Sequence, residues 1–187
     1  MTGNAESSGR RRLLVAKGTF EAMRGAERDL IRNLPALAQE FDVTVATLQP
    51  SKELKNCIRK HSIPLLYPDI IWKPSTGTIA RILNSDLKSS LKSWKSISGL
   101  KEVIDEVDAV HLVSGDGSFG LIRIIPKKKA FHLHMLEPHR GLYEEVLHLD
   151  VKGEPKRNIG ITKLALSKAK RDDSRVIKNL LKRQMSR

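Results

Sequence analysis

Short apolar runs of strand length alternate along this chain with stretches of helical periodicity, and this alternation limits the fold more than any other feature. After Gly25, for example, apolar residues recur three and four positions apart, as on one face of a helix. Strand-length runs that alternate with helices are typical of parallel sheets built from β-α-β units. The sequence therefore predicts an α/β fold around one parallel sheet. The predicted strands are Arg12–Ala16, Phe41–Thr47, Ile63–Tyr67, Asp108–Val113 and Ala130–His134.

The segments between these runs carry signals that begin and end helices. Ser51 is a good N-cap, and Pro64 stops the helix that follows it soon after Lys60. Pro35 lies inside the first helical pattern, where it should kink the helix or start a new first turn. We expect a single Rossmann-like, doubly wound parallel sheet with helices on both faces. Further helices are predicted over Thr78–Lys95 and Leu100–Glu106, and from Gly117 to about Ile125.

Length and charge divide the chain into three parts. A chain of 187 residues suits one domain. Residues 1–11 are polar and then basic, without the apolar stretch of a secretory signal, so we expect a disordered basic start. Residues 12–150 hold the Rossmann-like domain. Residues 151–187 contain 12 Lys or Arg and 3 Asp or Glu, a net +9 of the total +13. We predict a basic helical tail there, with the last strand of the domain as an alternative for part of it.

The compartment and the partners follow from composition. The single cysteine, Cys57, excludes an internal disulfide framework and a multi-cysteine metal site. The lone cysteine and the missing secretory signal predict a cytoplasmic protein, with a peripheral position at the membrane as an alternative. No apolar run approaches the length of a membrane span. The basic tail attracts polyanions, and its helical pattern from Ser174 onward suits an anionic membrane surface or a partner protein. Nucleic acid is not an expected partner, because aromatic residues make up 4% of the chain and no binding motif is present.

In a doubly wound sheet, ligands bind outside the carboxyl ends of the strands. Gly25 lies at such a place, at a loop–helix junction where backbone can approach a ligand and the helix start offers free N–H groups. The loop lacks the glycine-rich fingerprint of dinucleotide binding and the P-loop pattern. A plain loop whose glycine starts a helix explains the pattern equally well.

Histidines mark two other strand ends. His132 and His134 share one face of a strand, but a metal site would need a third ligand, for which Glu137 is the only near candidate. We predict no metal, and a contact to substrate competes with a purely structural role for His134. His111 precedes a glycine-rich turn, and its structural and functional interpretations stay open. Glu137 and Arg140 provide a carboxylate and a cation at the mouth of the crevice.

Three ordered blocks of the sequence resemble the N-terminal domain of family 4 glycosyltransferases of the GT-B fold. The first block is Gly25-Ala-Glu-Arg28 with the following helix and Phe41-Asp-Val-Thr-Val45. The second is Asp108-Ala-Val-His111, and the third is His134-Met-Leu-Glu-Pro138 followed by Arg140 and Leu142-Tyr143-Glu144. Two departures are Arg24, in place of the first glycine of the family's pair, and Met135, in place of an aspartate.

The resemblance implies one half of a GT-B fold. Such enzymes transfer a hexose from a nucleotide sugar, the donor substrate, to a sugar or lipid-linked acceptor, with retention and without a required metal or other cofactor. The acceptor lies mainly against the N-terminal domain, so His134 is the expected catalytic residue. Substrate contacts are expected from Gly25, Glu27, His111, Glu137 and Arg140.

The family's donor-binding domain has no counterpart in these 187 residues, so we expect a separate C-terminal domain as a partner. The alternative is a non-catalytic module that docks on an anionic membrane or a partner transferase through its basic tail. In both cases Gly25, His111 and His134 should lie around one cleft.

Overall fold

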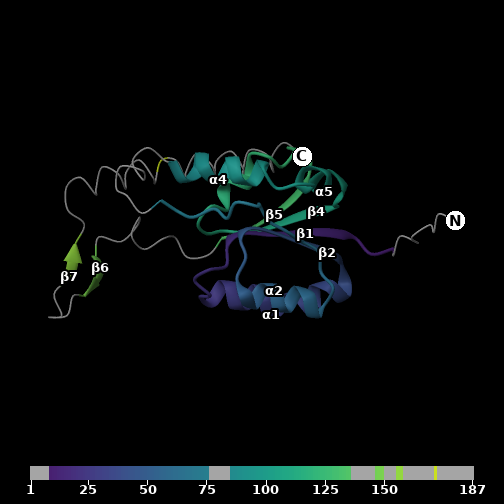
Figure 1. Cartoon of the computed structure of the whole chain (residues 1–187), viewed down its shortest axis with the longest axis horizontal. Helices are drawn as coiled ribbons and strands as arrows, with labels where there is room; N and C mark the ends of the chain where they lie inside the picture. Colours follow the sequence, from purple (N-terminus) through teal and green to yellow (C-terminus); the bar gives the residue numbers. More distant parts are fainter. Residues whose placement is uncertain (1–8, 76–84, 136–145, 150–154, 158–170, 172–187) are drawn as a thin grey trace.

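The computed structural model describes residues 9–75, 85–135, 146–149, 155–157 and 171. Five strands form one all-parallel sheet in the order β3-β2-β1-β4-β5, with the crossover between β1 and β4 (Figure 1). This confirms the predicted α/β, Rossmann-like fold. The strands are β1 Arg12–Thr19, β2 Asp42–Gln49, β3 Leu65–Leu66, β4 Ala109–Val113 and β5 Ala130–His134.

Helices lie on both faces of the sheet (Figure 1). On one face, α1 Gly25–Glu40 and α2 Lys52–Lys60 pack against β1 and β2. On the other face lie α4 Ser85–Lys95, α5 Leu100–Glu106 and the short α6 Phe119–Ile122. Successive strand residues point to opposite faces. Leu14 and Ala16 therefore join the core under α4 and α5, and Val15 joins the core under α1.

Several boundaries differ from the sequence-based prediction. β1 continues three residues past Ala16, because Lys17 and Thr19 still pair with β2. β3 is shorter than the predicted Ile63–Tyr67. The helix predicted from Gly117 to about Ile125 is α6, which ends at Ile122. Ser51 is the predicted N-cap, and its Oγ accepts a hydrogen bond from the Leu54 N–H at 3.1 Å.

α1 passes through Pro35 as one helix, not as two. Proline has no N–H, so the carbonyl of Ile31 loses its usual partner one turn later. The thiol of Cys57, on α2, donates to that carbonyl at 3.5 Å between sulfur and oxygen. Burial raises the pKa of Cys57, which keeps the group in its donating thiol form. The cysteine thus satisfies the acceptor that the proline leaves open.

Parts of the predicted termini are placed by specific contacts. In the expected disordered start, Arg10 donates to the carbonyls of Ala38 and Gln39 at the C-terminal end of α1, at 3.1 and 3.3 Å. A cation there also meets the negative end of the helix dipole. An antiparallel pair, β6 Val146–Leu149 with β7 Pro155–Arg157, was not predicted, and β7 belongs to the expected helical tail. Residues 1–8 and most of 151–187 lie outside the described part of the chain.

Candidate functional site

The order of the strands reverses between β1 and β4, and ligands of doubly wound sheets bind at such a switch point. Two connections meet there: residues 20–24, which lead from β1 into α1, and residues 114–118, which lead from β4 into α6. The first turn of α1 lies at the same edge of the sheet. The candidate site is therefore built from the carboxyl ends of β1 and β4 and the start of α1.

Lys17 is the central charged residue of this edge. Its side chain points to the α1 face and is 3% exposed. Its Nζ lies 3.1 Å from Glu27 Oε1, in the first turn of α1, and donates to the carbonyl of Ser114 at 3.1 Å. One amino group thus joins β1, α1 and the β4–α6 connection. This role was not predictable from the sequence, because the apolar run ends at Ala16 and a lysine in that position is typical of a loop.

Glu27 is the buried partner of Lys17. Burial acts to raise the pKa of this carboxyl, but the charge and hydrogen bond of Lys17, with the backbone N–H groups of Glu27 and Arg24, outweigh it and leave the pKa below its ordinary value. The contact with the Arg24 backbone resembles half of a capping box, in which an N3 glutamate reaches back to the N-cap. No side chain of Arg24 caps the helix.

Two buried acceptors at this edge of the sheet have no hydrogen-bond partner in the described part of the chain: Glu27 Oε2 and Gln49 Oε1. Gln49 ends β2, and its Cα pairs with Thr19 of β1. Buried acceptors of this kind are costly unless water or a ligand donates to them. The edge therefore has unused capacity to accept hydrogen bonds.

The β4–α6 connection is held in place from several sides. Gly18 N donates to Ser118 Oγ at 2.9 Å, and Trp94 Nε1 donates to the carbonyl of Gly117 at 2.9 Å. Gly117 has φ of +75°, which favours glycine. A Cβ on Gly18 would collide with the carbonyl oxygen of Asp116. Such a connection is preorganised, with the side chain of Asp116 exposed to solvent.

Register places the histidines on the same face as Lys17. In one row across the sheet, Lys17 pairs with Val113, which pairs with His134. In the row behind it, Val15 pairs with His111, which pairs with His132. At about 4.8 Å between neighbouring strands, Lys17 and His134 are about 10 Å apart at the backbone. The charged pair and the histidines thus share one face at one end of the sheet.

The imidazole of His111 lies beside those of both His132 and His134. The rings of His111 and His132 are stacked with centroids 4.8 Å apart, and their Nδ1 atoms are 2.7 Å apart. The centroid of His134 lies 6.2 Å from that of His111. In an Nδ1–Nδ1 hydrogen bond one ring donates and the other accepts, so the accepting ring is neutral. Burial, with the neighbouring His132 and His134, lowers the pKa of His111 to about 4, so this ring is uncharged at neutral pH.

The residues singled out from the sequence are only partly brought together. His111 and His134 lie on the α1 face, and Glu27 pairs with Lys17 on that same face. Gly25 begins α1 and is exposed, and a Cβ there would meet nothing within 4 Å. A close approach between two backbone segments requires glycine at position 18 instead, where β1 passes Asp116. Glu137 and Arg140 lie outside the described residues.

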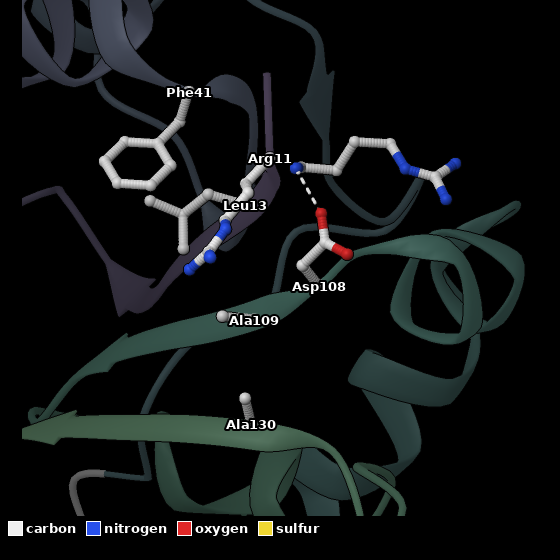
Figure 2. Close-up of a pocket in the computed structure, with 7 residues that line it drawn as sticks. Arg11, Leu13, Phe41, Asp108, Ala109 and Ala130 are labelled. Atoms are coloured by element: carbon white, nitrogen blue, oxygen red, sulfur yellow. Dashed lines mark hydrogen bonds between the residues drawn. The ribbon is translucent and has the colours of Figure 1, made fainter. Parts of the chain in front are cut away.

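A hollow of about 420 Å³ lies at the opposite edge, where β1, β4 and β5 begin. Figure 2 shows its apolar lining together with Asp108, whose Oδ2 accepts from the backbone N–H of Arg12 at 2.7 Å. Its apolar residues are Leu13, Phe41, Ala109 and Ala130. This hollow is not at the edge where doubly wound folds bind ligands, and Asp108 serves to join β4 to β1.

Comparison with known proteins adds no family. No protein-family model matches the chain, and no curated protein matches it. Within the described residues, no three side chains of His, Cys, Asp or Glu have their atoms in place around a common point for a metal ion. None of the helices described is both long enough and apolar enough to cross a membrane.

Proposed function

We propose that this chain provides the acceptor-side domain of a retaining glycosyltransferase, which transfers a hexose from a nucleotide sugar to a sugar or lipid-linked acceptor. In this proposal a second domain, outside residues 1–187, holds the donor. The resemblance of three ordered sequence blocks supports it, as does the doubly wound fold that holds the first two blocks and His134, the first residue of the third.

The observation that carries the proposal is the row formed by Lys17, Val113 and His134 at the switch point. The Lys17–Glu27 pair stands at one end of this row, and the exposed His134 stands at the other. Polar groups fixed on rigid strands at one edge are what a polyhydroxyl ligand needs, because such ligands are oriented by a few well-placed hydrogen bonds.

The electrostatics of this edge suit an uncharged acceptor better than a phosphate group. Glu27 neutralises Lys17, and His111 carries no charge at neutral pH. The exposed Arg24 and Arg28 flank the start of α1, where N–H groups and the helix dipole favour an anion. In the proposed enzyme the sugar lies beside His134, and the start of α1 faces the donor phosphates.

His134 is the proposed catalytic residue. By the family resemblance, it contacts the reacting sugar in this proposal. A neutral imidazole can donate one hydrogen bond and accept another. Its backbone is fixed, since the N–H of Ser114 donates to the carbonyl of His134 at 3.0 Å. A positioned group of this kind acts on the charge that develops during sugar transfer.

The test is a titration of the ¹⁵N-labelled chain with short oligosaccharides and soluble acceptor analogues, followed by amide chemical shifts. We expect the largest shifts at residues 19–25, 114–118 and 134. The substitution His134→Ala should weaken binding about tenfold, as the loss of one good hydrogen bond does. His61→Ala is the matched control, because His61 is exposed at the end of α2 on the far side of β1.

Shifts confined to the hollow near Arg12 and Asp108 would contradict the proposal. So would the absence of binding by every saccharide at millimolar concentration. A nucleotide sugar added alone should shift at most the amides at the start of α1, which faces the donor phosphates in this proposal, and should leave residues 114–118 and 134 unmoved.

A further inference from the structure

His132 and His134 share one strand face, and the structure adds the third imidazole that their sequence neighbourhood lacked. His111 lies on β4, and its Cα is the register partner of His132 on β5. Both strands present these side chains on the α1 face of the sheet. Three imidazoles therefore lie close together on one face of the sheet. Two of them are two residues apart on β5, and the third is opposite His132 on β4.

The spacing of the His111 and His132 nitrogens is close to that of two ligands of one metal ion. Around tetrahedral zinc, with metal–nitrogen distances of about 2.0–2.1 Å, two ligand nitrogens are separated by about 3.3 Å. The Nδ1 atoms of His111 and His132 are 2.7 Å apart, held by a hydrogen bond. They need to separate by roughly 0.6 Å to accept a cation between them. The His111 and His134 rings, with centroids 6.2 Å apart, need to approach slightly.

The hydrogen bond explains why the rings are not arranged around an ion as they stand. One Nδ1 carries a proton and points at the lone pair of the other. If that proton moves to Nε2 of the same ring through solvent, both Nδ1 lone pairs become available. This tautomer change leaves the total number of bound protons the same. Rotation of exposed side chains supplies the remaining movement, since His132 and His134 are both exposed.

We infer that His111, His132 and His134 form a binding site for one divalent transition-metal ion of the zinc type. Three imidazoles without a carboxylate suit zinc, cobalt, nickel or copper, and do not suit magnesium or calcium, which prefer oxygen ligands. Three protein ligands leave a fourth position for water or a ligand oxygen. The inference does not depend on the proposed function. If both hold, a bound ion occupies His134 and competes with the sugar.

The experiment uses the full chain without a polyhistidine tag. Cobalt(II) is added at pH 7.5, and its visible absorption is followed, because a four- or five-coordinate ion absorbs much more strongly than the hydrated octahedral ion. We expect one ion per chain and displacement of cobalt by zinc. Isothermal titration with zinc alone supplies the affinity.

The variants His132→Ala and His134→Ala are the informative ones, because both side chains are exposed and their removal spares the core. Each should weaken zinc binding at least about tenfold, the lower end of what a disturbed metal site loses. His61→Ala should leave the affinity unchanged, and so should His139→Ala and His148→Ala. Far-UV circular dichroism of each variant confirms that it is folded.

Equal affinity in His132→Ala, His134→Ala and the unsubstituted chain would overturn the inference, as would a purely octahedral cobalt spectrum. Loss of binding in His139→Ala or His148→Ala alone would also overturn it, because it would move the site elsewhere. Saccharide binding is measured without metal. Its failure would therefore count against the proposed function and leave the metal site standing.

Discussion

At the scale of single residues, the Lys17–Glu27 pair shows how a buried charge is kept in this fold. Both side chains are nearly inaccessible, at 3% and 11% exposed. Within the described residues, neither of them forms a salt bridge with any other residue. Removal of one member of such a pair leaves an uncompensated buried charge, which costs more than the pair contributes. The pair is thus a structural requirement of the site as well as part of its chemistry.

Substitution of this lysine should destabilise the protein strongly. Lys17→Met should lower the free energy of unfolding by about 3 kcal/mol, because Glu27 then stays buried without its cation. Urea unfolding followed by circular dichroism measures this. The double variant Lys17→Met, Glu27→Leu should recover most of the loss. Arg32→Ala, which breaks the exposed Asp29–Arg32 pair of 3.7 Å, should change stability by about 0.5 kcal/mol or less. Equal effects of Lys17→Met and Arg32→Ala would contradict this picture.

The same pair predicts a dependence on pH. Because the folded-state pKa of Glu27 lies below its ordinary value of 4.5, ionised Glu27 stabilises the fold above that pH. This stabilisation is lost as the pH falls through the lower, folded-state pKa. Urea unfolding from pH 7 to pH 3 should therefore show a large difference between the unsubstituted chain and Glu27→Gln at pH 7, and a smaller one at pH 3. Parallel pH curves for the two proteins would show that Glu27 does not contribute in this way.

At the scale of elements, α1 and α2 are joined by a contact that depends on a proline. Pro35 leaves the carbonyl of Ile31 without a helical partner, and Cys57 donates to it. Because each half of this arrangement accounts for the other, the two positions should be coupled. A continuous helix across Pro35 is tolerable here partly for that reason.

A double-mutant cycle measures the coupling. Cys57→Ala should cost about 1 kcal/mol in the free energy of unfolding, the usual net value of a hydrogen bond. In the background of Pro35→Ala, the backbone N–H at position 35 can bond Ile31 itself, so Cys57→Ala should cost clearly less. Pro35→Ala alone should raise stability, since proline is unfavourable within a helix. Strictly additive losses in the cycle would exclude the proposed link.

The β4–α6 connection offers a second prediction at this scale. Gly18→Ala places a methyl group against the carbonyl of Asp116 and near the backbone N–H of Ser118. We expect a loss of about 2 kcal/mol, as for other overpacked positions, with shifted amides at residues 114–118. Gly25→Ala is the matched control, because a Cβ there meets open space at a helix start with ordinary backbone angles. A tolerated Gly18→Ala would mean that the connection can move away from β1 at little cost.

At the scale of the whole molecule, the order of strands and helices was predictable because hydrophobic periodicity is a local signal. β5 and α5 have the predicted bounds. The strand predicted for β1 was too short because its last residues, Lys17 to Thr19, are not apolar. The pair β6 and β7 was missed, since neither carries a strong strand pattern.

Contacts between distant segments were not predictable, because register and packing decide them. No local sequence pattern around Lys17 predicts Glu27 and Ser114 as its partners. Glycine is needed at position 18 because of Asp116, which lies almost a hundred residues later in the chain. In the same way, His111 meets His132 only through the pairing of β4 with β5. The sequence singled out Glu27, His111 and His134, which lie on one face of the sheet, but not Lys17 and Gly18, which lie at the same edge.

Both tryptophans of the chain lie at the β4–α6 connection. Trp94 is fully buried and bonded to the carbonyl of Gly117, and the ring of Trp72 lies where a Cβ of Gly117 would be. Intrinsic fluorescence of the unlabelled protein therefore reports almost entirely on this short segment. A ligand that displaces this segment will change the emission spectrum, and one that binds elsewhere will leave the spectrum unchanged. The molecule thus carries its own optical probe of the switch point.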